Sequence, residues 1–216
     1  KVISLDLRTI FDQVYDELLW NKKIPQVYAR KNNISFEEAY EKVINLYRED
    51  WDSAEGKWRD PYYWIKKLEL DISFEELTKE IDEYIKPYPD AVFTIKHLSK
   101  KYVLIIASNA HTTFINHKLE KAGLRKYFSA TYSFPGDFNA LFADDKIYRK
   151  ICDNLEVSPN KVIHLGSDFE EDYQIPSSIG IKSFMIDRGG KKKESYSIRD
   201  LIEFRRKIKE FELKRK

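Results

Sequence analysis

The residues best suited to chemistry in this sequence are carboxylates and a hydroxyl that stand directly after short apolar runs. Asp6 comes after VISL, and Ser108 and Asn109 close the run LIIASN. Asp168 comes directly after VIHLGS, and Asp172 follows a few residues later. A carboxylate, a hydroxyl and an acidic loop form a candidate catalytic site, and the acidic loop is also a candidate metal site. Each residue taken alone could equally cap a turn or face solvent.

These residues can act together only if the runs before them are neighbouring strands. Residues 2–6, 102–107 and 161–166 read as strands, and their apolar character is typical of strands buried on both faces of a parallel sheet. From residue 88 onward, strand-like and helix-like segments alternate, which predicts a doubly wound α/β fold with a Rossmann-like core. In such sheets ligands bind outside the carboxyl ends of the strands, where all the candidate residues lie.

Between the first strand and the rest of the sheet, the sequence has a helical pattern. Two of its helices are expected to begin after Ser35 and Ser73, which are followed by glutamates as helix caps often are. The motif KPYPD then interrupts the pattern. We therefore expect an all-helical domain inserted after the first strand, with residues 1–10 and 88–216 forming the core and residues 11–87 the insertion.

All the tryptophans lie in this expected insertion, at Trp20, Trp51, Trp58 and Trp64. Aromatic side chains carry a large apolar area, so they could pack the core of the insertion itself. They could also wall a substrate pocket, and Trp20 is the candidate for a substrate contact. The sequence leaves both interpretations open.

The candidate residues and their order resemble the haloacid dehalogenase-like (HAD) superfamily, in the branch with a helical cap inserted after the first motif. The stretch KPYPDAVFTIKHLSKKYVLIIASNA is similar to the run into that superfamily's second motif. The stretch LEVSPNKVIHLGSDFEEDYQIPSSIGIKSFMIDR is similar to the run through its fourth motif. The resemblance covers nearly the whole chain, and it implies a hydrolase that acts on a small phosphorylated or halogenated molecule.

The resemblance also implies roles for the candidate residues. Asp6 takes the place of the nucleophile, which attacks phosphorus or carbon and forms a covalent intermediate. Ser108 matches the hydroxyl of the second motif, which hydrogen-bonds the phosphoryl or carboxylate group, and Asn109 stands beside it. Asp172 matches the distal aspartate of the fourth motif, so a Mg²⁺ site would use Asp6, Asp168 and Asp172.

The sequence departs from the superfamily's pattern at three motifs. The first motif reads DLRTI instead of Asp-x-Asp-Gly-Thr, so Arg8 stands where a second aspartate is usual and the glycine is missing. Phe142 holds the place of the third-motif lysine, and the nearest lysine, Lys146, comes later. Ser167 holds the place of the first aspartate of the fourth motif, with Asp168 shifted by one. We therefore expect weak Mg²⁺ binding or none.

Arg8 determines what such a site could still do. The usual second aspartate protonates the leaving oxygen and then activates water, whereas an arginine can do neither because it keeps its proton. In an extended segment residues i and i+2 point to the same side, so Arg8 could lie against Asp6. Arg8 could act in catalysis by supplying the charge that a lysine or Mg²⁺ usually supplies. Alternatively, it could hold Asp6 in an inert salt bridge.

Two functions from different classes therefore remain open. The intact Asp6, Ser108 and Asp172 favour an active hydrolase that uses an aspartate nucleophile. The departures at the three motifs favour a catalytically degenerate HAD-fold protein that binds a ligand or a partner. The geometry around Asp6 is the observation that separates these hypotheses.

Composition makes several other classes of function improbable. The chain has 216 residues and a formal net charge of +2, which is too small to indicate a nucleic acid partner. No apolar stretch approaches the length of a membrane span, and the single cysteine, Cys152, excludes an internal disulfide. We expect a cytoplasmic protein with a small-molecule substrate. Low Cys and Met with abundant Lys and Glu favour a thermophile, and the sequence leaves the oligomeric state open.

Overall fold

The centre of the protein is a parallel β-sheet. The computed structural model describes residues 1–51, 57–191 and 194–213. Six strands follow the order β3-β2-β1-β4-β5-β6, and every neighbouring pair is parallel. This arrangement confirms the predicted α/β fold with a Rossmann-like core. The strands are β1 (Val2–Leu5), β2 (Val103–Ser108), β3 (Ala130–Ser133), β4 (Val162–Gly166), β5 (Lys182–Ile186) and β6 (Ser197–Ile198).

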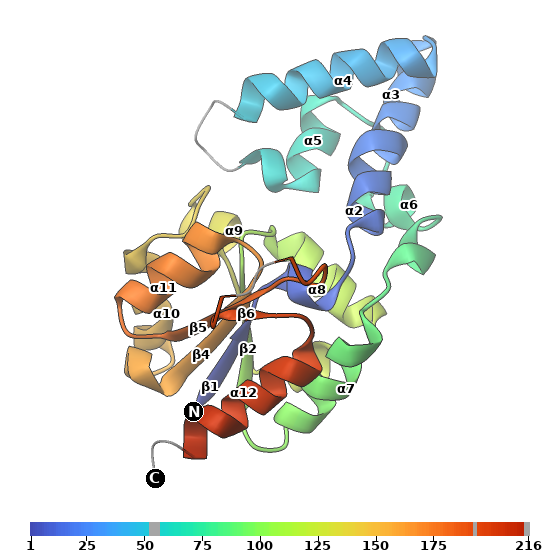
Figure 1. Ribbon diagram of the computed structural model, residues 1–216. Coiled ribbons are helices and arrows are strands. Elements are labelled where there is room, and N and C mark those ends of the chain that lie inside the picture. The colour runs from blue at the N-terminus through green and yellow to red at the C-terminus, as the bar shows by residue number, and fades with distance from the viewer. Residues whose placement is uncertain (52–56, 192–193, 214–216) are drawn as a thin grey trace.

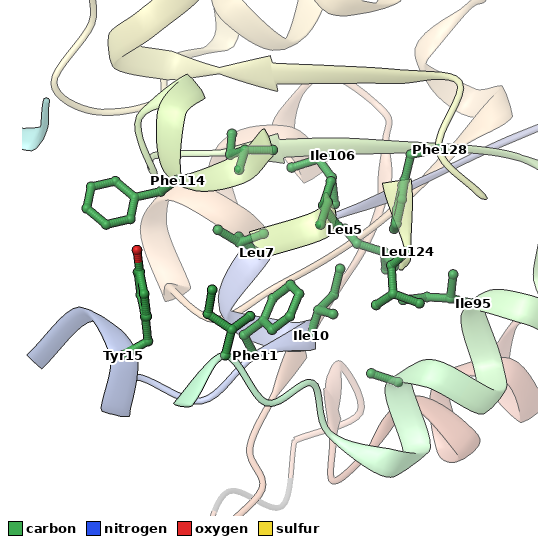
Figure 2. Close-up of a cluster of buried hydrophobic side chains, with 14 of the residues drawn as sticks. Leu5, Leu7, Ile10, Phe11, Tyr15, Ile95, Ile106, Phe114, Leu124 and Phe128 are labelled. Atoms are coloured by element: carbon green, nitrogen blue, oxygen red, sulfur yellow. The ribbon is translucent and has the colours of Figure 1, made fainter. Parts of the chain in front are cut away.

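Both faces of the sheet are covered, because side chains of alternate strand residues point to opposite faces. Ile3 and Leu5 of β1 belong to one apolar cluster, and Val2 belongs to the other. The first cluster includes residues of α7 (Pro89–Leu98), α8 (Thr112–Lys121) and α12 (Leu201–Leu213). The second includes residues of α9 (Phe134–Phe138), α10 (Asp145–Asn154) and α11 (Ile175–Ser178). Figure 2 shows part of the first cluster, where Leu5 and Ile106 face Ile95 and Leu124. The short helices η4 (Arg125–Tyr127) and η5 (Pro159–Lys161) precede β3 and β4.

A separate layer of helices follows the first strand, and Figure 1 shows it as an extension beyond the carboxyl ends of the strands. We call residues 14–84 the helical segment; none of its described residues belongs to the sheet. Its two connections to the core meet at Phe11 and Pro87, which form an isolated antiparallel bridge. The residue limits of the two predicted domains stay a prediction, and they include residues outside the described ranges. The elements are α2 (Val14–Leu18), η1 (Leu19–Lys23), α3 (Ile24–Asn32), α4 (Phe36–Trp51), η2 (Lys57–Arg59), α5 (Pro61–Lys67), α6 (Phe74–Thr78) and η3 (Asp82–Tyr84).

The predicted helix caps in this segment are confirmed. Ser73 and Glu76 form a reciprocal capping box at the start of α6. The hydroxyl of Ser35 accepts a hydrogen bond from the backbone N–H of Glu38 at 3.1 Å, at the start of α4. Trp64 is fully buried and donates its indole N–H to the carbonyl of Trp58 at 2.8 Å. Trp64 therefore packs the interior of the helical segment, as one of the two interpretations of the tryptophans predicted.

The helical segment is fastened to the core mainly through α8. Lys118 of α8 donates to Asp16 at 2.6 Å, and His117 lies 2.7 Å from a carboxylate oxygen of Asp82. The ring of Phe114 makes an edge contact with Tyr15, at a centroid distance of 6.4 Å, and both rings are visible in Figure 2. Buried apolar and charged contacts thus fix one side of the helical segment over the carboxyl ends of β1 and β2.

The chain after β1 differs from the extended segment that we expected. The strand ends at Leu5, and α1 (Leu7–Ile10) begins at once. Asp6 is the residue that ends the strand, because its side chain accepts a hydrogen bond from the backbone N–H of Arg8 at 3.2 Å. The prediction that Arg8 follows Asp6 in an extended segment is therefore wrong, since the N-cap turns the chain into a helix.

The sequence predicted no membrane-spanning segment, and the structure tests this for helices. Among the residues that the structure describes, we find no helix with the length and apolar character needed to span a bilayer.

Candidate active site

Asp6 lies at the carboxyl end of the central strand, at the point where the connections change from one side of β1 to the other. Only 3% of the residue is exposed. One carboxylate oxygen accepts a hydrogen bond from the hydroxyl of Ser108 at 2.6 Å. The other accepts from the hydroxyl of Ser167 at 3.0 Å and from the backbone N–H of Arg8 at 3.2 Å. Donors from the ends of β1, β2 and β4 thus meet on one carboxylate.

The environment of Asp6 makes its charge costly. Burial raises the pKa of Asp6 from 3.8 to about 6, and the nearby Asp172 carboxylate acts in the same direction. The hydroxyls of Ser108 and Ser167 and the charge of Arg8 act against this rise. Asp6 is therefore mostly ionised at pH 7, yet close enough to its pKa that small changes around it would alter its charge.

Asp172 is a second buried carboxylate, 5% exposed, and it is held by the loop after β4. One of its oxygens accepts the backbone N–H groups of Ser167 and Asp168 at 2.7 and 2.9 Å. Burial would raise the pKa of Asp172, but hydrogen bonding and charge from His164 together with these N–H groups outweigh it and keep the pKa below its ordinary value. Asp172 is thus a fixed negative charge beside Asp6.

Gly166 allows Asp172 to approach the backbone this closely. A Cβ atom at position 166 would lie 2.1 Å from both Cβ and Cγ of Asp172, which is far inside contact distance. Behind Asp172, the buried His164 lies with Nε2 3.4 Å from the carboxylate and with Nδ1 2.8 Å from the hydroxyl of Ser4. The position after β4 therefore needs glycine for steric reasons.

Ser108 and Asn109 are held by a second loop, which follows β2. The hydroxyl of Ser108 accepts the backbone N–H of Ala110 at 3.2 Å while it donates to Asp6. Ser133, at the end of the neighbouring strand β3, donates its hydroxyl to the carbonyl of Ala110 at 2.8 Å. These contacts orient the Ser108 hydroxyl toward the carboxylate.

A cavity of about 610 Å³ extends from these loops up into the helical segment. Arg8, Ser108 and Asn109 lie at its core end, and Trp20 lies on its wall, so the structure brings these predicted residues to one cavity. Its other aromatic lining residues are Phe11, Tyr47, Trp51, Trp58 and Phe114. Three of the four tryptophans therefore line the cavity, which is the second of the two interpretations made from sequence.

Arg8 is exposed and lines this cavity. Within the described part of the chain, its guanidinium forms no ion pair with Asp6; the contact between the two residues is the backbone N–H. The hypothesis of an inert salt bridge is therefore wrong, because the described partners of the Asp6 carboxylate are two hydroxyls and this backbone N–H.

A family model of haloacid dehalogenase-like hydrolases matches residues 7–180. The chain belongs to the haloacid dehalogenase-like hydrolases. The nucleotidase YrfG of Escherichia coli, named for GMP and IMP, is 23% identical over 185 residues, which span 81% of this chain and 76% of that protein. A HAD phosphatase structure from Thermococcus onnurineus has a TM-score of 0.80 and 28% identity, with 96% of this chain and 97% of that chain covered.

Other members of the fold are more distant in sequence. A 2-haloacid dehalogenase from Pseudomonas syringae pv. Tomato DC3000 has a TM-score of 0.68 at 16% identity, over 98% of this chain and 99% of that chain. The putative HAD-hydrolase YfnB of Bacillus subtilis, whose structure is described as bound to magnesium, has a TM-score of 0.66 at 15% identity, over 94% and 96%. These two similarities support the fold of this HAD-like hydrolase.

Magnesium does not fit the acidic residues as they are arranged in this HAD-like hydrolase. The carboxylate of Asp168 accepts the backbone N–H groups of Glu170 and Glu171, at 2.9 Å each, and so caps the helix η6 (Glu170–Gln174). Asp172 is also committed to backbone N–H groups. Among the described residues, no group of three His, Cys, Asp or Glu side chains is placed to hold a metal ion. The structure therefore does not bring Asp6, Asp168 and Asp172 together as the predicted metal set within its described residues, and loop N–H groups bond one oxygen each of Asp168 and Asp172.

Position 142, where the family pattern has a lysine, supplies no positive charge to the site. Phe142 is 50% exposed, and Lys146 is an exposed residue in the first turn of α10. Lys118, which does line the cavity, is paired with Asp16. The positive charges whose interaction with Asp6 is resolved belong instead to Arg8 and Arg59.

Three residues of the site were missed from sequence. Ser167 was noted only as a departure from the family motif, yet it donates to Asp6. His164 lies inside a strand pattern, where a buried polar residue at that end of the sheet was a usable signal. Arg59 comes from η2 and lines the same cavity; burial lowers its pKa to about 10, with Arg8 acting in the same direction and Glu171 and Asp6 against it. No sequence motif marked Arg59.

The steric role of Gly166 is testable by stability. Gly166→Ala should lower the free energy of unfolding by about 2 kcal/mol or more, because the new Cβ must displace Asp172. Gly189→Ala is the matched control, since its Cβ would meet its nearest neighbour, Asp187, at an ordinary 3.5 Å. We expect that control to stay within about 0.5 kcal/mol of wild type in urea unfolding. Equal effects of the two substitutions would contradict the assignment.

The raised pKa of Asp6 predicts a pH-dependent stability. The folded protein holds the Asp6 proton more tightly than the unfolded chain, so the contribution of Asp6 to stability falls as pH rises from 3.8 to about 6. Asp6→Asn removes this titration and should stabilise the protein by about 1 to 2 kcal/mol at pH 7. The gain should vanish near pH 4. Urea unfolding at both pH values measures it, and a gain of the same size at both would refute ionisation of the buried carboxylate as its cause.

Proposed function

We propose that this protein is a hydrolase whose nucleophile is the Asp6 carboxylate and whose substrates are small phosphorylated molecules. One observation carries the proposal. Asp6 is buried, and Ser108, which donates to it at 2.6 Å, lines a cavity large enough for a small substrate. A carboxylate that is poorly solvated and held by weakly acidic donors is suited to attack an electrophile.

Hydrolysis would proceed in two steps. An Asp6 oxygen attacks phosphorus, the bond from phosphorus to the leaving oxygen breaks with its electron pair on that oxygen, and an aspartyl phosphate forms. Water then attacks the phosphorus of this intermediate, which releases inorganic phosphate and restores the carboxylate. The Ser108 hydroxyl, which donates to Asp6 before substrate binds, is in position to donate to a phosphoryl oxygen.

The leaving group is where this site differs from a general phosphomonoesterase. Arg8 occupies the position of the usual acid–base aspartate and cannot transfer a proton. His111 lines the cavity, but burial lowers its pKa, so the imidazole is mostly neutral at pH 7 and a weak acid. General acid catalysis contributes roughly 10²–10⁴ in rate, so substrates with a stable leaving anion should be strongly preferred.

The same lack of a proton donor separates the protein from the nucleotidase to which it is similar. Release of a nucleoside from its monophosphate produces an alkoxide that needs a proton. We therefore propose that GMP and IMP are poor substrates of this protein. The aromatic wall of the cavity instead supports a phosphate ester with an apolar or aromatic body, with the helical segment acting as a cap that contacts this body.

A halogenated carboxylic acid is the second candidate substrate, and the same observation favours it. A halide leaves as a stable anion, so its displacement from carbon by Asp6 needs no proton donor. The absence of an acidic side chain at position 8 is therefore no obstacle to dehalogenation. Chloride release from 2-chloropropionate distinguishes this candidate from the first.

The missing general acid predicts the substrate range. Wild type should hydrolyse p-nitrophenyl phosphate slowly and leave glycerol phosphate and GMP nearly untouched. Arg8→Asp, assayed with Mg²⁺, should narrow the gap between the two ester types by about tenfold, because the new carboxyl can act as an acid. Phosphate release from each ester measures the ratio. Two carboxylates close together tend to raise one pKa, as a general acid requires.

Asp6→Asn is the control for the nucleophile and should abolish activity on every ester. Brisk wild-type turnover of glycerol phosphate would show that another group acts as the acid. Full activity of Asp6→Asn would show that the nucleophile is not Asp6. If wild type turns over neither the phosphate esters nor 2-chloropropionate, the degenerate binding protein becomes the better interpretation.

The pH profile should report the Asp6 carboxylate directly. Since the nucleophile must be ionised, kcat/KM for p-nitrophenyl phosphate should rise by about tenfold per pH unit below pH 6 and level off above it. Ser108→Ala removes a hydrogen bond that lowers the Asp6 pKa, so its inflection should move to higher pH. Ser167→Ala should move it less, because its hydrogen bond has a smaller effect. Titration of the substrate is common to all variants, so an inflection that is identical in all three would exclude Asp6 as its source.

A further inference from the structure

Two guanidinium groups line the core end of the cavity, and they come from different parts of the chain. Arg8 belongs to α1, directly after the central strand, and Arg59 belongs to η2 of the helical segment. Each acts electrostatically on Asp6, and they also repel one another. Two like charges are therefore held close together beside the candidate nucleophile.

Arg59 is placed with unused hydrogen-bonding capacity. Its Nε atom is buried and has no hydrogen-bond partner among the described residues. The guanidinium carbon lies 4.5 Å from the ring centroid of Trp58, so the indole supports one face of the group. The charge of Glu171 attracts it, without an ion pair between the described atoms. A buried guanidinium N–H without an acceptor is costly, which indicates a missing anionic partner.

Arg8 also has a guanidinium group that is available to bind an anion. Its backbone is fixed by the Asp6 cap, and within the described ranges its side chain takes part in no hydrogen bond or ion pair. An arginine can bind an oxyanion through two parallel N–H donors. Arg8 and Arg59 together therefore offer two such forks on the wall of the cavity that Ser108, the hydroxyl donor to Asp6, also lines.

We infer that Arg8 and Arg59 form a paired guanidinium site that binds the oxyanionic group of the substrate, a phosphate, without a divalent cation. The inference rests on the proposed function, because the bound phosphate is the group that Asp6 attacks. Two positive charges supply what one Mg²⁺ ion would, at a site whose described acidic residues are not arranged for a metal. One guanidinium is contributed by the helical segment, so phosphate binding also links that segment to the core.

The test measures phosphate binding separately from turnover. Isothermal titration calorimetry with inorganic phosphate in EDTA is applied to wild type, Arg8→Gln, Arg59→Gln and the double variant. Each single substitution should weaken binding by about tenfold, and the double variant more, because each removes charge-assisted hydrogen bonds. Adding Mg²⁺ should leave wild-type binding unchanged. Arg59→Lys, which keeps the charge but loses the fork, should lie between wild type and Arg59→Gln.

Arg149→Gln is the charge-matched control. Arg149 is exposed on α10, pairs with Asp145 of the preceding turn and does not line the cavity. It should bind phosphate as wild type does. Circular dichroism and thermal unfolding of each variant establish that a loss of binding is not a loss of fold. L-lactate replaces phosphate in a parallel titration, and stronger binding of lactate would assign the pair to a carboxylate instead and overturn the phosphate assignment.

The outcomes separate the inference from the proposed function. Phosphate binding that requires Mg²⁺, or that is unchanged in Arg59→Gln, overturns the inference even if p-nitrophenyl phosphate is hydrolysed through Asp6. Arginine-dependent binding in EDTA by a protein that hydrolyses nothing supports the paired site and overturns the hydrolase. Hydrolysis that persists in EDTA and falls with either arginine supports both.

Discussion

The Asp6 carboxylate is 3% exposed, so water cannot solvate its charge and the protein must supply the donors. A hydroxyl from β2, a hydroxyl from the loop after β4 and a backbone N–H from α1 meet this need. They can converge because parallel strands end at the same edge of the sheet, and β1 lies between β2 and β4. The order of the strands is thus a requirement of the site.

The carboxylate of Asp172 increases the free-energy cost of the negative charge on Asp6. Asp172 is held by loop N–H groups and His164, which keep it charged and directed at its own backbone. Its field adds to the cost of ionising Asp6, and the Asp6 pKa stays raised even though the hydroxyl donors and the charge of Arg8 act against the rise. Arg8 and Arg59 are positive charges on the described cavity wall that attract the ionised Asp6. The site therefore depends on the helical segment for part of its charge balance.

The parts of this site that could be predicted from the sequence are those set by local pattern. Apolar runs at residues 2–6, 102–107 and 161–166 predicted three strands of one parallel sheet, because buried parallel strands have a distinctive composition. The helix caps at Ser35 and Ser73 were also predicted from a local pattern, a serine followed by glutamates. Helix α9 was not predicted, because its five residues are too few to show a helical period.

Features that depend on contacts distant in sequence were beyond such a pattern. The position of Arg59 is set by the packing of Trp64 and Trp58 and by the contact of the helical segment with α8. The direction of the Arg8 side chain depends on the helical turn that the Asp6 N-cap begins. The same residues after Asp6 could continue as an extended segment, so the sequence does not distinguish the two conformations. Only the folded chain distinguishes a blocked carboxylate from a free one.

The exchange of an aspartate for Arg8 changes the chemistry in two opposite ways. It removes the proton donor that a poor leaving group needs, and it adds a permanent charge within reach of an attacked oxyanion. A metal-dependent site with two acidic residues has the reverse balance, since the cation supplies the charge and the second carboxyl the proton. In the proposed reaction, Arg8 would make a cation less necessary at the same position where it makes a general acid unavailable. A preference for stable leaving groups and phosphate binding without a metal ion would then both follow from the arginine at position 8, and neither requires the nucleophile to be inert.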